Sequence, residues 1–485
     1  MINLMRRHPR FFVYACAAAA ALRLCCVLWF PVSFDDDTVY YAELGRNAFQ
    51  YGTYGSLVDG TVIPTDVRLP GYPAFLAAVF AVFGDQHYRP VLLIQVLVDL
   101  GSCLLMAGIA LVLMGEGAAL AVLLLAALCP FTANYAAVAL TETWSIFFTS
   151  LALWAAVKGN AVLRGGAGIG LSWWLVCGLA IGAATLLRPD GIMLLMALGV
   201  FLTWRLLRAP EKRQVLTAGT ASALVVVLML TPWTWRNWVT FHELQPLAPR
   251  NFTAPAEYSP VGFYRWYKTW PAEFATLYDV FWKVNSVAPA PEPIVLDEVP
   301  SLAWDTPPEG ERTLALFRTL NETSQLSPEL DAQFGALAAE RIARDPLRYY
   351  LYLPVFRIAD IWLRPRTEQF YDGERELLFD QYWWRFESVG QSLFSIGYAL
   401  LNALLLAVAV MGMWSFRRAP GAGLLIGFVA LRSAFLGTLE NPEPRYVLEC
   451  FPVILVFAGA QIEVMLRAVA RAAGSRAAPG CGRPI

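Results

Sequence analysis

Long apolar runs separated by short polar stretches occupy most of the chain. The runs cover residues 11–32, 71–84, 91–113, 118–133, 143–157, 170–187, 191–207, 215–233, 348–363, 389–415, 421–439 and 447–467. A membrane-spanning helix needs ~20 mostly apolar residues, and most of these runs approach that length. A membrane β-barrel would instead show strict alternation of apolar and polar residues. The pattern therefore predicts an all-α polytopic membrane protein.

Two of the runs differ from the others. The run 71–84 is short and is bordered by Pro70 and interrupted by Pro73, whereas the run 348–363 carries Arg357 within it. A short run does not reach across a bilayer, and a charge in the middle of a span is costly. We expect both runs to form interfacial helices that lie on the outer surface of the membrane.

The basic residues support this topology. They gather in clusters that the positive-inside rule assigns to the cytoplasm, at residues 6–10, 158–164, 205–213, 417–418 and 467–483. If the two short runs crossed the membrane, the cluster at 205–213 would lie outside and the segment 234–347 inside. Leaving both runs on the outer surface predicts about ten transmembrane helices, with both termini in the cytoplasm.

This topology divides the chain into four parts. We expect an N-terminal transmembrane module at 1–233 with a polar first outer loop at 33–90, a small mixed periplasmic domain with an interfacial helix at 234–388, C-terminal transmembrane helices at 389–467, and a cytoplasmic tail at 468–485. Within the outer domain, residues 329–345 read as a helix between two prolines, and the proline-rich stretch 289–308 reads as irregular loop. The tail is expected to be disordered.

Composition excludes several classes of protein. Apolar residues make up 57% of the chain and charged residues only 15%, whereas soluble domains carry about 25% charged residues. The 37 basic and 38 acidic residues leave no basic excess, so nucleic acid is not an expected partner. With three His and no Cys-x-x-Cys spacing, we expect no His-based metal cluster, zinc ribbon or disulfide framework.

Three adjacent carboxylates, Asp35, Asp36 and Asp37, directly follow the first span. Their mutual repulsion raises the pKa of some of them unless a cation or an Arg neutralises the cluster. That chemistry suits a general base or a metal site. The alternative is that Asp35 or Asp36 caps a helix over 38–50 and the other carboxylates favour its positive end. The two interpretations are compatible.

Basic and polar residues recur at the outer ends of the predicted spans. Arg68 precedes a rigid turn that contains Tyr72, and its planar fork of donors suits a phosphate. The predicted topology places on the same side of the membrane Glu142, Arg188, Arg236 and the pair Arg445 and Tyr446. Anchoring to lipid headgroups and an interfacial aromatic belt explain each residue singly. They explain the whole set less well, because the short outer turns otherwise hold few basic residues.

Two ionisable residues, Arg23 and Asp99, lie deep within predicted spans. Charges inside a membrane are rare and are usually paired or functional. We expect these two to pair with each other, with a proton relay as the alternative.

Taken together, the motifs resemble the C-type membrane glycosyltransferases and, among them, glycosyltransferase family 39, which includes protein mannosyltransferases and lipid A aminoarabinose transferases. The matching positions are Asp36, Asp37 and Tyr40 for an Asp-Glu-x-x-Tyr motif, residues 68–73 for Arg-x-Pro-Gly-Tyr-Pro, Glu142, residues 188–191 for Arg-Pro-x-Gly, residues 232–237 for Pro-Trp-x-x-Arg-Asn, and Arg445-Tyr446. At Asp37 an Asp replaces the family's Glu. The resemblance covers the first 240 residues well and the C-terminal third loosely, and 240–345 has no match.

The resemblance implies an inner-membrane enzyme that works on the periplasmic side. The donor would be a polyprenyl-phosphate sugar, and the acceptor a hydroxyl of a lipid, glycan or protein. Asp36 would be the general base, assisted by Asp37, and the sugar would be transferred with inversion. The donor phosphate would be bound by Arg68, Arg188, Arg236 and Arg445, and substrates would be positioned by Asp35, Tyr40, Tyr72, Glu142 and Tyr446.

The Asp at position 37 leaves open which carboxylate is the base. It also leaves open a divalent cation at Asp35, Asp36 and Asp37, although the family is regarded as metal-independent and we predict no cofactor. Two other functions remain as alternatives: a polymerase or ligase of lipid-linked glycans, and a lipid or glycan transporter. A scaffold or sensor would leave the Asp cluster and the outer Arg residues unexplained.

Overall fold

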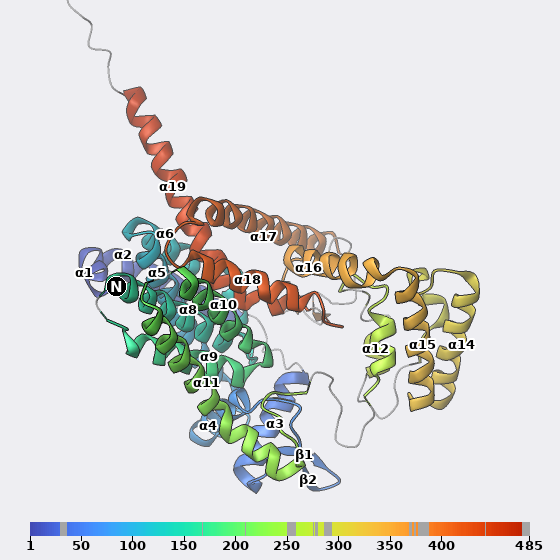
Figure 1. The fold of residues 1–485 in the computed structure, drawn as a ribbon. Helices are drawn as coiled ribbons and strands as arrows, with labels where there is room; N and C mark the ends of the chain where they lie inside the picture. The colour runs from blue at the N-terminus through green and yellow to red at the C-terminus, as the bar shows by residue number, and fades with distance from the viewer. Residues whose placement is uncertain are drawn as a thin grey trace, which may run out of the picture.

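The computed structural model describes residues 1–29, 36–166, 168–208, 210–249, 259–274, 276, 280–285, 293–367, 371–372, 375–376, 388–441 and 443–477. Helices dominate these residues (Figure 1). The helices long and apolar enough to cross a membrane are α2 (Pro9–Trp29), α5 (Tyr88–Leu113), α8 (Glu142–Arg164), α10 (Met193–Arg208) with the turn η1 (Pro189–Ile192), α11 (Lys212–Phe241), α17 (Val389–Phe416), and α19 (Phe451–Ala477) with the turn η6 (Pro444–Cys450). The predicted all-α polytopic membrane fold is confirmed.

Four apolar helices are shorter. They are α4 (Gly71–Phe83), α6 (Glu116–Ala127), α9 (Leu171–Leu187) and α18 (Ala422–Leu436). The prediction of about ten spans counted three of these, α6, α9 and α18, as full crossings. The run 118–133 is divided because Pro130 starts a separate helix, α7 (Pro130–Tyr135), and proline is favoured at a first helical position, where its missing N–H costs nothing.

The bundle is built by close approach of helix backbones. α9 packs against α8 and α11, α5 packs against α6 and α8, and α19 packs against α6 and α17. A Cβ at Gly178 would lie 2.6 Å from the carbonyl oxygen of Ser222, and one at Gly412 would lie 2.1 Å from that of Phe457. Only glycine allows this approach, as expected of helices packed within a membrane.

The two intramembrane charges pair as predicted. Nε of Arg23 donates to Oδ2 of Asp99 at 2.6 Å, and the two side chains are 0% and 1% exposed. The same guanidinium donates to the carbonyl oxygens of Ala126 and Ala127. These carbonyls lie at the C-terminal end of α6, where a positive charge is favourable. The pair therefore fixes the end of one helix against two others.

The first outer loop folds into α3 (Asp36–Tyr51) and a hairpin of β1 (Gly55–Val58) and β2 (Thr61–Pro64). The expected helix over 38–50 is confirmed and begins at Asp36. The hairpin turn consists of Asp59 and Gly60, both with positive φ, which is the combination a tight two-residue turn prefers. α3 packs on α4, and this contact holds the first outer loop against the helical bundle.

The outer segment contains a helical unit that stands beside the bundle in Figure 1. It consists of α12 (Val261–Tyr267), α13 (Trp282–Asn285), the short turns η3 (Leu296–Glu298) and η4 (Ser301–Ala303), α14 (Pro307–Thr323) and α15 (Pro328–Arg344). α15 confirms the helix expected at 329–345, whereas the sequence analysis did not predict α14. The unit has its own aromatic core, which includes Phe263, Trp266, Phe317 and Phe334.

A short π-helix, η5 (Arg348–Tyr352), and α16 (Leu353–Leu363) connect this unit to the C-terminal helices. The structure also describes a short pair of strands, β3 (Tyr371–Asp372) and β4 (Arg375–Glu376). Arg357 of α16 donates to the carbonyl oxygens of Lys268 and Pro271. Nζ of Lys268 also pairs with Glu440 at 2.7 Å, in the segment before η6. The outer unit is thus bonded to α16 and to the segment just before η6.

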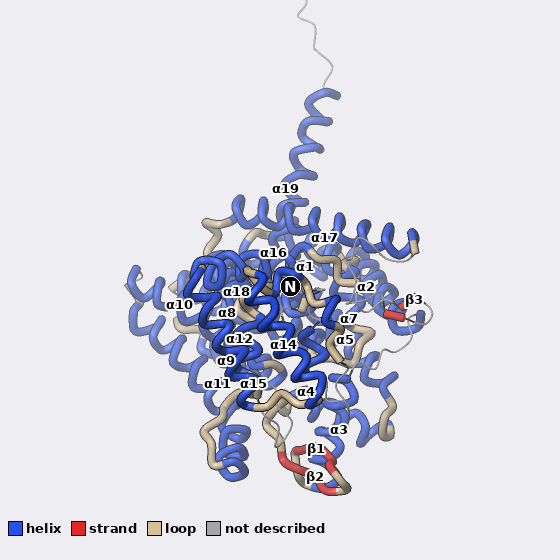
Figure 2. The backbone as a smooth tube through the Cα atoms, turned by 90° about the vertical axis from the view of Figure 1, so that its right-hand side faces the viewer, coloured by secondary structure: helices blue, strands red, loops and turns tan. Residues whose placement is uncertain are grey.

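The C-terminal end differs from the expectation. The chain after Arg467 was predicted to be disordered, but α19 continues to Ala477 and extends beyond the bundle in Figures 1 and 2. Its last turns are rich in Ala, the best helix former, and Arg467 pairs with Glu463 one turn earlier. In both figures this end lies opposite to the β1–β2 hairpin.

Candidate functional site

Asp37, at the start of α3, lies between two Arg side chains from distant parts of the chain. Nη2 of Arg68 donates to its Oδ1 at 2.8 Å, and Nη2 of Arg445 donates to its Oδ2 at 3.0 Å. Arg68 belongs to the first outer loop and Arg445 to η6. The structure therefore brings together three of the residues that the sequence motifs singled out.

These contacts control the charge of Asp37. Burial raises the pKa of its carboxyl group, but the charges of Arg68 and Arg445 and their hydrogen bonds outweigh burial and hold the pKa well below its usual range. Asp37 is thus a carboxylate at any ordinary pH. While both Arg side chains hold it, it is a weak proton acceptor and a strong anchor for their positive charges.

A second group of charges adjoins the first. Glu142, at the start of α8, accepts a hydrogen bond from Nη1 of Arg188 at 3.1 Å, and its Oε1 lies 3.8 Å from Nε of Arg445. The Glu142 side chain is 1% exposed. Its Oε2 is buried and has no hydrogen-bond partner among the described residues. A buried carboxylate oxygen of this kind is costly unless a substrate group or water satisfies it.

Tyr446 and Glu443 complete this side of the cluster. The hydroxyl group of Tyr446 donates to Glu443 at 2.9 Å, and Glu443 also pairs with Arg445. The guanidinium of Arg188 lies 4.6 Å from the centre of the Tyr446 ring, within the range of a cation–π contact. The Arg188 guanidinium therefore lies over the Tyr446 ring, and its edge lies against carboxylates.

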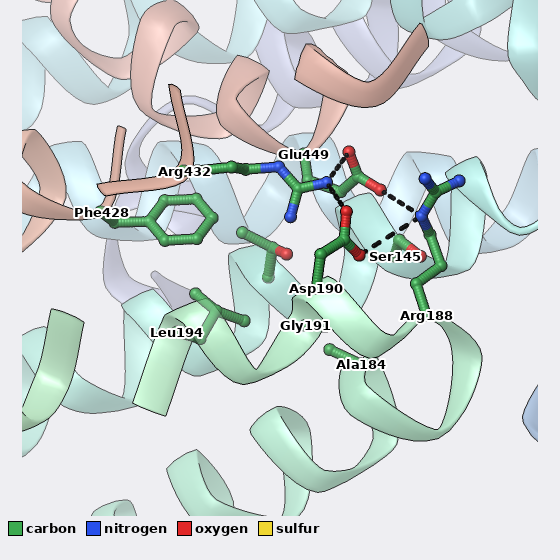
Figure 3. Close-up of a pocket in the computed structure, with 10 residues that line it drawn as sticks. Ser145, Ala184, Arg188, Asp190, Gly191, Leu194, Phe428, Arg432 and Glu449 are labelled. Carbon is green, nitrogen blue, oxygen red and sulfur yellow. Dashed lines mark hydrogen bonds and ion pairs between the residues drawn. The ribbon is translucent and has the colours of Figure 1, made fainter. Parts of the chain in front are cut away.

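A further layer of paired charges lies behind Arg188 (Figure 3). Asp190 and Glu449 each approach Nε of Arg188 at 3.4 Å. The same two carboxylates pair with Nη2 of Arg432 at 2.7 and 2.8 Å. These residues border a cavity of about 10 Å³, which also contacts Ser145. A cavity of that size holds about one water molecule.

The sequence analysis did not select Arg432, Glu449, Asp190 or Glu443. Asp190 lay within the quoted Arg-Pro-Asp-Gly turn, but only its Arg was chosen. Arg432 lies inside the apolar run 421–439. A charge in such a run is a functional signal in itself, so this residue could have been found by the argument that found Arg23.

Arg236 lies outside this ion-pair network within the described part of the chain. It donates to the carbonyl oxygens of Tyr54 and Thr65 at 2.6 and 2.9 Å, and therefore ties α11 to the residues that flank the hairpin of the first outer loop. It also lies over the rings of Tyr54 and Trp233. These contacts support the shape of the loop that carries Arg68.

The two remaining Tyr candidates lie around Arg68. Tyr40 lies 5.9 Å from the Arg68 guanidinium and accepts a hydrogen bond from Ser56. Tyr72 is fully buried, and its hydroxyl group donates to Gln95 at 2.9 Å. Tyr40 thus lies beside Arg68, whereas Tyr72 packs against the ring of Tyr41, which lies 5.9 Å from the same guanidinium.

The structure leaves two predicted positions undescribed. Asp35 and the side chain of Asp36 lie outside the described residues. Among the residues that are described, no group of three or more His, Cys, Asp or Glu is placed to hold a metal ion.

Residues 67–235 match the dolichyl-phosphate-mannose-protein mannosyltransferase family. The match contains Arg68, Glu142 and Arg188, and it confirms the resemblance drawn from the motifs. Asp37, Arg432 and Arg445 lie outside the matched residues. A search among curated proteins finds no match to the chain.

Solved structures agree on the fold. The archaeal oligosaccharyltransferase AglB from Archaeoglobus fulgidus, in complex with an inhibitory peptide and a dolichol-phosphate, has a TM-score of 0.53 at 12% identity. The alignment covers 99% of this chain and 53% of that one, so the chain spans about half the length of that protein. The C-type glycosyltransferase fold is thus shown.

Two further solved structures are similar. The crystal structure of the Archaeoglobus fulgidus oligosaccharyltransferase in complex with Zn and sulfate has a TM-score of 0.53 at 11% identity, covering 94% of this chain and 49% of that one. ArnT from Cupriavidus metallidurans bound to undecaprenyl phosphate has a TM-score of 0.40 at 16% identity, covering 95% and 79%.

Proposed function

We propose that this protein is a membrane glycosyltransferase that moves a sugar from a polyprenyl-phosphate donor to a hydroxyl group on the outer side of the inner membrane. The observation that carries the proposal is the convergence of Arg68, Arg188 and Arg445 around Asp37 and Glu142. Three guanidinium groups at the end of a helical bundle suit a phosphate whose lipid tail remains in the bilayer.

The reaction needs both a base and stabilisation of a leaving group. A base removes the proton of the acceptor hydroxyl, whose oxygen forms a bond to the anomeric carbon. The bond from that carbon to the phosphate oxygen breaks on the opposite face, and the lipid phosphate leaves with the electron pair, so the configuration inverts. Arg68, Arg188 and Arg445 stabilise the charge that develops on the phosphate, and Arg236 is a further candidate at the edge of the first outer loop.

The contacts favour different roles for Asp36 and Asp37. Asp37 is engaged by Arg68 and Arg445, and its depressed pKa makes it a poor base. We therefore assign the base to Asp36, its neighbour at the start of α3, and assign to Asp37 the assisting role of fixing the two Arg side chains.

Positioning of the substrates falls to the remaining polar groups. The unsatisfied Oε2 of Glu142 is an acceptor for a sugar hydroxyl. Tyr446 borders the same space through its contact with Arg188. Asp35, Tyr40 and Tyr72 are the further positioning candidates. The helical unit formed by α12, α14 and α15 would cover the donor or select the acceptor, which is a lipid, a glycan or a protein.

The two alternatives make different predictions. A transporter moves ionisable groups near the membrane midplane, but Arg23 and Asp99 are locked to each other and to α6. That arrangement favours a static structural pair. A polymerase or ligase of lipid-linked glycans uses the same donor chemistry and differs only in the acceptor.

The test compares the purified wild-type protein with Asp36→Asn and Asp37→Asn. Each is incubated with a panel of polyprenyl-phosphate sugars and a mixed membrane extract, and the release of free polyprenyl phosphate is measured. We expect Asp36→Asn to lower kcat by ~10²–10⁴-fold with little change in donor binding, as for loss of a general base. Asp37→Asn should also weaken donor binding.

The matched control is Asp85→Asn, which removes a carboxylate from an exposed pair with Arg46 and should release phosphate like the wild type. Absence of release from every donor in the panel, or full activity of both site variants, would rule the proposal out. The sugar that is consumed identifies the donor, and the product carrying it separates a transferase from a polymerase or ligase.

A further inference from the structure

We infer that Arg432 is a positioning residue that acts through Asp190 and Glu449 to orient Arg188 toward the donor phosphate. This inference rests on the proposed function and deepens it. It concerns residues of α18 and η6 that lie beyond the matched family region.

The geometry is a relay of alternating charges. Asp190 and Glu449 each pair on one side with Nε of Arg188 and on the other with Nη2 of Arg432. Arg432 also donates to the carbonyl oxygen of Tyr446 from Nε and Nη2. Its side chain is 1% exposed. Arg432 is thus fixed at three points and has no access to substrate.

The charge count explains why Arg432 is needed. Asp190 and Glu449 carry two negative charges against the single charge of Arg188. Inside a protein such charges interact strongly, because little solvent screens them. With Arg432 present, each of these two acidic groups has a second cationic partner. Without it, both act on Arg188 alone, so they hold its guanidinium more strongly and repel an approaching phosphate.

The orientation of Arg188 supports the same conclusion. Figure 3 shows that its Nε faces the two carboxylates and that its terminal nitrogens point away from them. Nη1 is used by Glu142 and Thr141. Within the described residues Nη2 donates no hydrogen bond, so one arm of the fork is available for a phosphate oxygen. Fixing Nε in advance lowers the entropy lost when the phosphate binds.

The experiment measures how strongly the protein prefers a lipid with a phosphate to one without. Binding of undecaprenyl phosphate and of undecaprenol is measured for wild type, Arg432→Gln, Glu449→Gln and the double variant. We expect Arg432→Gln to reduce the phosphate preference by about 10–100-fold, the loss expected for one charge-assisted hydrogen bond. The double variant, which restores the charge balance, should recover most of it.

Arg23→Gln is the matched control because Arg23 is equally buried and also paired with a carboxylate. It should destabilise the protein without changing the phosphate preference. A purely structural role for Arg432 would weaken binding of both lipids alike. An unchanged preference in Arg432→Gln, or no recovery in the folded double variant, would overturn the inference.

If Arg432→Gln does not fold, Glu449→Gln decides the matter. It leaves Arg188 with one carboxylate neighbour fewer and should strengthen the phosphate preference, so an unchanged or weaker preference refutes the relay. The proposed function has a separate test. It fails if the wild-type protein itself shows no preference for undecaprenyl phosphate over undecaprenol. If Arg188→Gln abolishes the preference and Arg432→Gln does not, only the inference about Arg432 is lost.

Discussion

Replacing Asp37 with Asn tests the centre of the site through its effect on stability. The substitution removes the negative charge that Arg68 and Arg445 share at 2.8 and 3.0 Å. A hydrogen bond to a charged group contributes about 1.5–3 kcal/mol. Since the Asp37 side chain is still 24% exposed, solvent weakens both pairs. We expect the free energy of unfolding to fall by about 2–4 kcal/mol at neutral pH.

The effect should depend on pH in a defined direction. The pKa of Asp37 is lower in the folded protein than the ordinary value of an aspartate, because the charges and hydrogen bonds of the two Arg side chains outweigh the effect of burial. A carboxylate of this kind stabilises the fold above the unfolded pKa, and its contribution is lost as the pH falls through the folded pKa. The difference in the free energy of unfolding between wild type and Asp37→Asn should therefore be constant above about pH 5 and shrink below pH 4.

The assay is reversible unfolding in mixed lipid–detergent micelles between pH 3 and 8, followed by tryptophan fluorescence. Asp85→Asn serves as the matched control, because Asp85 pairs with Arg46 at the surface and is 52% exposed. Asp85→Asn should change the free energy of unfolding by no more than about 1 kcal/mol. Equal stability of Asp37→Asn and wild type at pH 7, or a difference that grows in acid, would refute the argument that Asp37 anchors the two Arg side chains.

Three other substitutions test contacts that support the fold around and beyond the site. Arg23→Gln leaves Asp99 buried and unpaired, so the free energy of unfolding should fall by about 3–5 kcal/mol, whereas replacing both residues by apolar ones should restore most of it. Gly262→Ala places a Cβ 2.1 Å from the carbonyl oxygen of Asp331 and should lower the free energy of unfolding by the ~1–3 kcal/mol typical of overpacking. Arg236→Met frees the first outer loop, and limited proteolysis should cut the β1–β2 hairpin faster than in wild type.

The hydrophobic pattern was sufficient to predict the membrane fold, and the charges within it predicted more. Arg23 and Asp99 were expected to pair because isolated charges are too costly in a bilayer, and they do pair. Of the ten expected spans, seven correspond to described helices long and apolar enough to cross a membrane, and three correspond to the shorter helices α6, α9 and α18. Helix ends within an apolar run depend on local features such as Pro130 at the start of α7, which hydropathy alone does not register.

Other features required three-dimensional information. The partners of Arg188 could not be deduced because Arg432 and Glu449 are distant in sequence and lie within or beside apolar runs. The hairpin at Asp59 and Gly60 had a local signal that the sequence analysis passed over. The aromatic core of the outer unit depends on long-range packing and has no periodic signature.

The distribution of the charged residues shows that no single segment makes the site. Asp37 and Arg68 come from the first outer loop, Glu142 and Arg188 from the N-terminal helices, and Arg432 and Arg445 from the C-terminal ones. The ion pairs that hold the Arg side chains proposed to bind the phosphate are the same contacts that join these segments.

Assembly of the helices and assembly of the site are therefore one process. Folding brings Arg432 and Arg445 against carboxylates of the N-terminal half, and burial makes each unpaired charge unfavourable. The salt bridge from Lys268 to Glu440 extends the same connection to the outer unit. Because Glu440 lies just before η6, which carries Arg445, the outer unit and the proposed phosphate site are joined by a short, directly bonded path.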